Sequence, residues 1–309
     1  MSNNNPAFHI TGLIAAPFTP FDAKGRLKLG VIPKLVKYYK ATGVSGAFVC
    51  GTTGEGASMS NEERFAVAKA WGAAMKGSRL KLIVHVGHNS LPESCALAAH
   101  AEKIGADAIA TIAPSFFRPE GVDGLVEWCK KVATAAPKTP FYYYHMPSMS
   151  GVNVAMADFL PLAAKSIRTF GGIKFTHENI MDYGLTLAAA GDKYDILFGR
   201  DEILLSALVM GAKGAVGSTY NYASALYNRV IAAYNAGDMK SAAAWQLESM
   251  KFIQAFCKHG GMSANKAILG LLGMDCGPVR PPMTPIAKDK IAAMKADLEE
   301  AGFFKNIRP

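Results

Sequence analysis

The feature that most constrains the fold is an alternation, repeated eight times, of a short apolar run with a longer stretch of helical pattern. Apolar residues recur at helical spacing most clearly in Asn61–Met75, Leu91–Ile104 and Asp201–Met210. Strands that alternate with helices form a parallel sheet with the helices outside it. The eight predicted strands are Gly12–Ala16, Gly46–Cys50, Lys81–Val86, Ala108–Ile112, Phe141–His145, Gly172–Phe175, Ile196–Phe198 and Ala215–Gly217.

This number of units predicts an α/β fold, a (β/α)8 TIM barrel, with residues 1–237 as the catalytic domain. The main structural competitor is a doubly wound sheet, which in its dinucleotide-binding form places a glycine-rich turn after the first strand. The first predicted strand is followed by Pro17-Phe-Thr-Pro20 instead. From residue 238 onward the pattern stays helical, so residues 238–309 are predicted to form a C-terminal helical extension packed on the barrel.

The composition excludes several classes of protein. The chain has 309 residues, half of them hydrophobic, which is enough for one large barrel with a real core. Its net charge is +9, but the Lys and Arg residues are dispersed and form no nucleic-acid-binding stripe. No apolar run approaches the roughly 18 residues of a membrane helix, and no secretory signal is expected. Five scattered cysteines without a CxxC pair favour free thiols in a reducing cytoplasm.

Active sites of (β/α)8 barrels lie at the carboxyl ends of the strands, so polar residues just after a strand are the functional candidates. Gly51-Thr52-Thr53-Gly54-Glu55-Gly56 follows the second predicted strand. Its glycines permit a tight turn, and its amides and two hydroxyls suit a carboxylate. It lacks the lysine and spacing of a nucleotide-binding P-loop. A plain turn before a helix capped by Ser60 is the equally weighted alternative.

Lys174 lies inside the sixth predicted strand, near its carboxyl end. Lysine is rarely buried without a partner. An apolar environment disfavours an ammonium ion, and a neutral amine can attack a ketone to form an imine, which then acts as an electron sink for C–C cleavage. Lys81 and Lys213 lie at the starts of strands, on the structural face. A lysine that extends to the surface is the alternative, and we favour the catalytic interpretation for Lys174.

The fifth predicted strand ends in Tyr142-Tyr143-Tyr144-His145-Met146-Pro147. Side chains alternate along a strand, so Tyr142 and Tyr144 share one face. Tyr144 is nearest the carboxyl end and suits proton transfer, although packing in the core explains it as well. His145 is expected to be a hydrogen-bonded structural residue.

Two further loops, Gly199-Arg200-Asp201-Glu202 and Gly217-Ser218-Thr219-Tyr220-Asn221, follow the last two strands. Their polar groups suit the hydroxyls of a polyol. The alternative is that the adjacent acids only complement the dipole of a helix start. The chain contains no HExxH or GxSxG motif and no cluster of metal ligands, which argues against metal- or serine-based catalysis.

Taken together, these motifs resemble the class I aldolases of the dihydrodipicolinate synthase and N-acetylneuraminate lyase superfamily over nearly the whole chain. The resemblance rests on Gly51–Glu55, on Tyr144 with Pro147, and on Gly172–Lys174. It is closest to the lyase branch in residues 141–147, 197–202 and 205–221. It implies that Lys174 is the Schiff-base lysine, that Tyr144 relays protons, that Thr52 and Thr53 bind the substrate carboxylate, and that Thr176, Gly199, Asp201, Glu202 and Ser218 line the site for the sugar-derived chain.

The resemblance also implies reversible cleavage of N-acetylneuraminate to N-acetylmannosamine and pyruvate, a homotetramer, and no metal or organic cofactor. The expected partners are small 2-keto acids such as pyruvate and sialic acid, with neither nucleic acid nor membrane. Three alternatives remain: an aldolase or dehydratase for another 2-keto sugar acid, an enzyme like dihydrodipicolinate synthase, and a non-catalytic 2-keto acid binding protein.

Two positions depart from the family pattern. Met149 stands where the synthases have an arginine that binds a carboxylate, and a thioether cannot form that ion pair, which counts against the synthase activity. The loop after the fourth strand, Pro114-Ser-Phe-Phe-Arg118, lacks the relay tyrosine of many relatives. Ser115, a threonine or water are the candidates to complete the proton path. The sequence leaves open whether Arg200 contacts substrate or only solvent.

Overall fold

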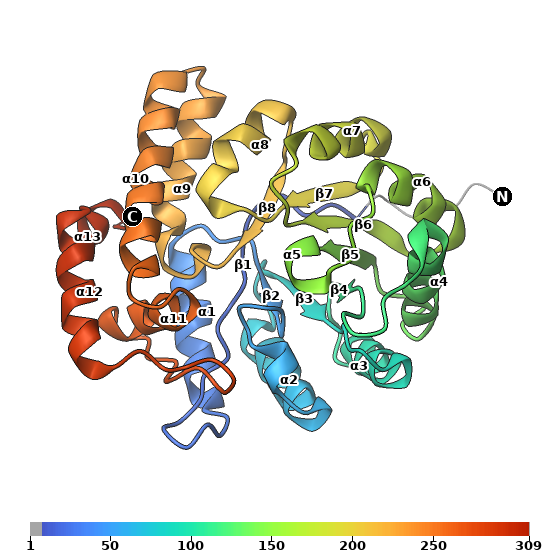
Figure 1. Cartoon of the computed structure of the whole chain (residues 1–309), viewed down its shortest axis with the longest axis horizontal. Helices are drawn as coiled ribbons and strands as arrows, with labels where there is room; N and C mark the ends of the chain where they lie inside the picture. Colours follow the sequence, from blue (N-terminus) through green and yellow to red (C-terminus); the bar gives the residue numbers. More distant parts are fainter. Residues whose placement is uncertain (1–7, 309) are drawn as a thin grey trace.

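The computed structural model describes residues 8–308, and its centre is a closed barrel of eight parallel strands surrounded by helices (Figure 1). Strands adjacent in sequence are adjacent in the barrel, and β8 pairs with β1 to close it. The (β/α)8 prediction is therefore confirmed, and the predicted strands differ from the observed ones only at their ends. The strands are β1 Gly12–Ala15, β2 Gly46–Val49, β3 Lys81–His85, β4 Ala108–Ile112, β5 Phe141–His145, β6 Phe170–Phe175, β7 Asp195–Phe198 and β8 Gly214–Gly217.

The helices follow the strands, as the alternating pattern predicts. Ser60 caps α2 as expected: its side chain accepts from the backbone N–H of Glu63, and the Glu63 side chain returns to the Ser60 backbone. None of the helices within residues 8–308 is long and apolar enough to cross a membrane. The helices around the barrel are α1 Ile32–Ala41, α2 Asn61–Met75, α3 Leu91–Lys103, α4 Gly121–Thr134, α5 Pro147–Ser150, α6 Met156–Ser166, α7 Ile180–Ala190, α8 Leu204–Met210 and α9 Tyr220–Asn235, with 3-10 turns η1 Leu29–Val31, η2 Gly56–Ser58 and η3 Asp201–Ile203.

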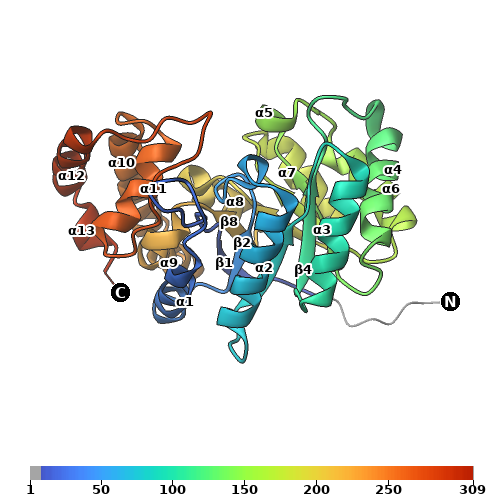
Figure 2. The same ribbon diagram turned by 90° about the horizontal axis from the view of Figure 1, so that it is seen from below.

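The chain from residue 238 to 308 is helical, as predicted, and contains no strand. Its elements are α10 Met239–Cys257, α11 Met262–Leu271, α12 Lys288–Glu300 and α13 Phe303–Asn306. They lie together on one side of the barrel, beside α9 and α1, in both views (orange and red in Figures 1 and 2). Phe252 of α10 and Leu298 of α12 belong to the same hydrophobic cluster as the barrel wall. The division of the chain into domains at residue 237 stays a prediction.

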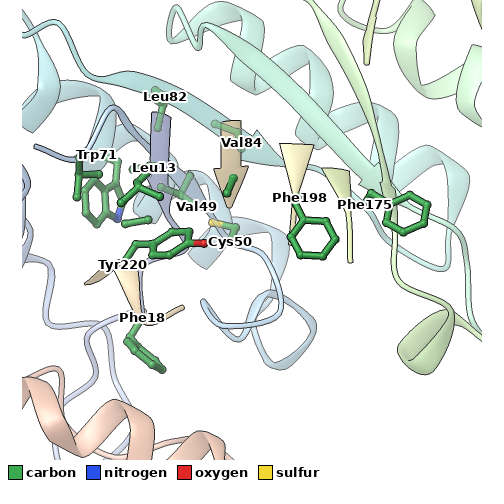
Figure 3. Close-up of a cluster of buried hydrophobic side chains, with 14 of the residues drawn as sticks. Leu13, Phe18, Val49, Cys50, Trp71, Leu82, Val84, Phe175, Phe198 and Tyr220 are labelled. Atoms are coloured by element: carbon green, nitrogen blue, oxygen red, sulfur yellow. The ribbon is translucent and has the colours of Figure 1, made fainter. Parts of the chain in front are cut away.

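Alternation along the strands separates two cores. An outer core lies between the strands and the helices, and Figure 3 shows part of it, with Leu13 and Val49 from strands packed near Trp71 of α2. An inner core fills the barrel and includes both Tyr142 and Tyr144, as the alternation in β5 predicts. In β6, Ile173 and Phe175 belong to the outer core, so the intervening Lys174 faces the barrel interior.

Candidate active site

Lys174 is held in the barrel interior against two aromatic rings. Its side chain is only 5% exposed. Its Nζ atom lies 3.8 Å from the centroid of the Tyr144 ring and 4.2 Å from that of Phe48. Within residues 8–308 no carboxylate forms a salt bridge with this amine. The aromatic faces attract the ammonium form, while the absence of a charge partner in this part of the chain leaves the amine available for reaction.

The hydroxyl of Tyr144 meets the glycine-rich loop that follows β2. Its Oη atom lies 3.2 Å from Oγ1 of Thr52 and also donates to Sδ of Met146 at 2.9 Å. The Tyr144 ring is edge-on to Phe48 and His85. Two residues predicted from separate motifs, Tyr144 and Thr52, are thus brought into hydrogen-bond contact at the carboxyl end of the barrel.

The loop itself is an unusual backbone structure. Cys50 and Glu55 both have left-handed conformations, with φ of 58° and 55°, which residues other than glycine adopt rarely. The N–H of Glu55 donates to the carbonyl of Thr52 at 3.0 Å, and Thr19 Oγ1 donates to the carbonyl of Gly54 at 2.6 Å. Thr52 is half-buried and Thr53 is buried. The two threonines are therefore carried on a turn whose shape is firmly fixed.

Thr176 and Gly199, which follow β6 and β7, lie against each other. A Cβ atom added to Gly199 would lie 1.9 Å from Oγ1 of Thr176, so glycine is the residue that fits. The Thr176 hydroxyl is buried and has no hydrogen-bond partner within residues 8–308. Buried hydroxyls ordinarily have partners, so this one suits a group that arrives with the substrate.

Asp201, on the same rim, is turned inward rather than toward solvent. Its Oδ2 atom accepts from the N–H and the hydroxyl of Thr219, at 2.8 and 2.7 Å. Its Oδ1 atom lies 1.7 Å from where a Cβ on Gly217 would be. Burial raises the pKa of Asp201 to about 6, and the charge of Glu202 adds to this, whereas the Thr219 hydrogen bonds and the charge of Lys174 act in the opposite direction.

The remaining residues of the predicted sugar site lie at the mouth. Glu202 is partly exposed and lies 3.8 Å from Nη1 of Arg200, whose Nη2 atom lies 2.5 Å from Oε1 of Glu178. Arg200 therefore bridges two acids of neighbouring loops. Ser218 is half-buried, and its hydroxyl accepts from Nδ2 of Asn265 on α11. The sugar-site residues thus come from the loops after β6, β7 and β8.

His85, the last residue of β3, is a further residue of the site that was not predicted from the sequence. Its ring meets Tyr144 edge-on, with centroids 5.7 Å apart. Nδ1 lies 3.1 Å from the carbonyl of Cys50, and Nε2 is buried without a partner in the described chain. Burial, assisted by the charges of Arg64 and Lys174, holds the pKa of His85 well below 6.5, so the ring is neutral. Its place at the end of a strand was the signal that could have identified it.

One other prediction is corrected in detail. His145 is structural, but it is not hydrogen-bonded: it packs against Phe175 in the outer layer, and neither ring nitrogen has a partner within residues 8–308. Of the three candidates to complete the proton path, Ser115 is exposed and its hydroxyl donates to Oδ1 of Asn89 at 3.3 Å, whereas within residues 8–308 a threonine hydroxyl, that of Thr52, lies beside Tyr144. Residues 8–308 contain no cluster of His, Cys, Asp and Glu suited to a metal ion.

The profile of the Dihydrodipicolinate synthetase family matches residues 9–301. The chain belongs to this family. Among its members, N-acetylneuraminate lyase of Mus musculus is 42% identical over 305 residues, which cover 97% of this chain and 95% of that protein.

Solved structures agree with this assignment. N-acetylneuraminate lyase of Proteus mirabilis superposes with a TM-score of 0.92 at 42% identity, over 95% of this chain and 99% of the other. A catalytic lysine mutant of the Ruminococcus gnavus sialic acid aldolase superposes with a TM-score of 0.90 at 30% identity, over 96% and 98% of the two chains. The resemblance that was first seen in the motifs therefore extends over nearly the whole of this chain.

Proposed function

We propose that the protein is a class I aldolase that cleaves N-acetylneuraminate reversibly to N-acetylmannosamine and pyruvate. The observation that carries this proposal is the buried Lys174 amine, which faces the barrel interior against the Tyr144 ring. The lyase activity named for relatives at 42% identity supports the choice of substrate. The catalytic lysine named in the Ruminococcus gnavus structure supports the chemistry.

In the first step the open-chain substrate places its carboxylate against Thr52 and Thr53. The Lys174 amine attacks the C2 ketone, and loss of water gives a protonated imine. The faces of the Phe48 and Tyr144 rings, which lie next to Nζ, favour this cation. The loop hydroxyls and amides favour the carboxylate beside it.

In the second step the C3–C4 bond breaks and its electron pair moves into the imine, giving an enamine. Tyr144 accepts the proton of the C4 hydroxyl, and Thr52, 3.2 Å from the phenol oxygen, is the first group on the proton path. N-acetylmannosamine leaves as the aldehyde. Protonation of the enamine at C3 and hydrolysis of the imine release pyruvate and restore Lys174.

The sugar chain extends toward the loops after β6, β7 and β8. The Thr176 hydroxyl, which has no partner within residues 8–308, binds a substrate hydroxyl. Glu202 and Ser218 at the mouth bind further ones. Gly199 leaves the space that the Thr176 side chain occupies. Asp201 accepts two hydrogen bonds from Thr219 and so holds that loop in place.

Borohydride trapping tests the proposal. The wild-type protein and Lys174→Ala are treated with pyruvate and borohydride, then analysed by intact mass and peptide mapping. We expect a pyruvate-sized adduct on Lys174 that is missing from the variant. If the wild-type protein forms no adduct, the imine mechanism is wrong and a binding protein becomes the better interpretation.

A screen of sugar acids then separates N-acetylneuraminate from another 2-keto sugar acid. Activity of the dihydrodipicolinate synthase type is not expected. Met149, which stands in the place of the synthase arginine, lies on α5 with its side chain 59% exposed and brings no charge to the site.

We also propose that the protein is a homotetramer in the cytoplasm. An apolar groove of about 570 Å³ lies between α8 and α10, and Val209, Met239 and Leu247 on it are exposed. Exposed apolar patches of this kind favour association. Analytical ultracentrifugation should give four times the chain mass of 32.8 kDa, and a monomer would contradict the proposal. All five cysteines are free, which suits a reducing compartment, and cell fractionation tests the location.

A further inference from the structure

The C-terminal helical region reaches the glycine-rich loop through one buried ion pair. Nζ of Lys266, on α11, lies 2.6 Å from Oε1 of Glu55, and the two side chains are 1% and 0% exposed. Lys266 also donates to the carbonyl of Pro278 at 2.8 Å. The second carboxylate oxygen of Glu55 accepts from the backbone N–H of Arg280 at 2.7 Å. Both oxygens of Glu55 are thus held by residues from the far end of the chain.

Stability alone does not account for this pair. Removing two charges from water costs about as much as their attraction returns, so a buried ion pair adds little over an apolar pair of similar shape. Glu55 also adopts a left-handed backbone conformation, with φ of 55°, which costs free energy in a residue with a side chain. Conformations of this kind persist where the surroundings impose them, and they are common at functional sites.

Glu55 is the residue that closes the turn carrying the two threonines. Its backbone N–H donates to the carbonyl of Thr52 at 3.0 Å, and the next N–H, of Gly56, donates to the carbonyl of Gly51 at 3.0 Å. Thr52 is in turn in contact with the Tyr144 hydroxyl. The contacts that hold the Glu55 side chain therefore also restrain Thr52, through the hydrogen bond from the Glu55 N–H to the Thr52 carbonyl. Thr52 is the residue proposed to bind the substrate carboxylate.

Arg280 secures the other side of the same turn. Its guanidinium donates to the carbonyl of Ser58 at 3.0 Å and forms an ion pair with Glu63 at 2.5 Å. The Phe21 ring lies beside both cations, 4.4 Å from Nζ of Lys266 and 4.1 Å from Cζ of Arg280. These contacts fix the segment immediately after the turn, so the loop is held at two points by residues beyond position 260.

We propose that Lys266 is a positioning residue for the keto acid carboxylate: it holds Glu55, and Glu55 sets the Thr52–Thr53 turn that binds that group. The inference rests on the proposed function, because it assumes that this turn receives the carboxylate. It goes further by making the C-terminal helical region part of the carboxylate site. The effect is expected on the keto acid half of the reaction, because Lys266 itself contacts Glu55 and Pro278, whereas the contact of α11 with the sugar-site residue Ser218 is made by Asn265.

Steady-state kinetics of Lys266→Met in the condensation direction tests the inference. We expect KM for pyruvate to rise about tenfold, with KM for N-acetylmannosamine within about threefold of wild type, because a binding contact to one substrate is weakened. The pyruvate concentration that gives half-maximal borohydride trapping should rise by the same factor. Trapping at saturating pyruvate should still label Lys174.

The matched control is Arg229→Met, which loosens the same region away from the loop. The Arg229 guanidinium donates to the carbonyls of Asn306 and Arg308 at 2.8 and 2.6 Å. This variant should lower the melting temperature while leaving both KM values unchanged. If Lys266→Met does not fold, Glu55→Gln/Lys266→Met removes both buried charges together and avoids an unpaired carboxylate. The same selective rise in KM for pyruvate is expected for it.

The inference would be overturned if folded Lys266→Met or Glu55→Gln/Lys266→Met had the wild-type KM for pyruvate. An equal rise in the KM values for pyruvate and N-acetylmannosamine would also overturn it. The two proposals fail in different ways. If the wild-type protein traps no pyruvate on Lys174, both are wrong. If the wild-type protein traps pyruvate on Lys174, and Lys266→Met and the double variant need the same pyruvate concentration for half-maximal trapping, only the positioning role is wrong.

Discussion

The amine of Lys174 lies over the ring of Tyr144, 3.8 Å from its centroid, whereas the hydroxyl of the same tyrosine is turned to Thr52, 3.2 Å away. The ring and the hydroxyl of Tyr144 therefore face different partners. The aromatic face supports positive charge on the amine, and the hydroxyl is placed for proton transfer. The two contributions can be separated by a substitution that keeps the ring.

Tyr144→Phe should form the pyruvate imine but cleave the sugar acid slowly. Loss of a positioned proton acceptor lowers kcat by roughly 10²- to 10³-fold, while the aromatic face beside Lys174 is retained. Borohydride trapping with pyruvate and steady-state cleavage of N-acetylneuraminate measure the two steps. A kcat close to wild type would show that another group accepts the proton.

Tyr142→Phe is the control, because Tyr142 lies on the same strand and the same face. Its hydroxyl donates to Oδ2 of Asp195 at 2.6 Å, at the start of β7. We expect kcat within about threefold of wild type and a loss of about 1–3 kcal/mol in the free energy of unfolding, because a buried carboxylate loses a donor. A fall in kcat like that of Tyr144→Phe would contradict the assignment.

Asp201→Asn should become more stable than wild type as the pH rises. Burial raises the folded-state pKa of Asp201 to about 6, against an ordinary value of 3.8. Below about pH 4 the carboxyl is protonated in both folded and unfolded chains. Between about pH 4 and 6 only the unfolded chain ionises, so wild type loses stability, and above about pH 6 this loss, about 2–3 kcal/mol, is complete. Urea unfolding of both proteins at several pH values from 4 to 7 measures the difference in their free energies of unfolding. A difference that stays constant over this range would contradict the prediction.

Gly199→Ala should impair the sugar side of the site selectively. Its new Cβ atom would lie 1.9 Å from Oγ1 and 2.8 Å from Cβ of Thr176, so that side chain must move. We expect kcat/KM for N-acetylneuraminate to fall roughly 10- to 100-fold, because a small displacement of a binding group is costly. Half-saturation of pyruvate trapping should not change. Gly30→Ala is the control, since no atom lies within 4 Å of its Cβ position.

Local sequence patterns were sufficient to predict the barrel. Each strand is a short apolar run, and the alternation of side chains along a strand placed Tyr142 and Tyr144 on one face of β5, which is the face inside the barrel. The carboxyl-end rule then identified Lys174 and the threonine loop as candidates. These inferences need only neighbours in the chain and one general property of the fold.

Contacts between distant parts of the chain could not be predicted in this way. Lys266 and Glu55 are 211 positions apart, and neither neighbourhood carries a pattern that names the other. Asp201 shows a second limit. Its place at the start of a helical stretch suggested a role toward the helix dipole, but its carboxylate turns to Thr219 on the next loop. Whether such a carboxylate faces its own helix start or a neighbouring loop depends on how the complete barrel packs.

The close approaches at Gly199 and Gly217 limit how the range of aldehyde substrates can be broadened by engineering. Both positions border the sugar site and already carry the smallest residue, and the space beside Gly217 is taken by Oδ1 of Asp201. Truncation there cannot enlarge the site. A library aimed at bulkier aldehydes should instead vary Glu202 and Ser218 at the mouth, where side-chain volume remains to be removed.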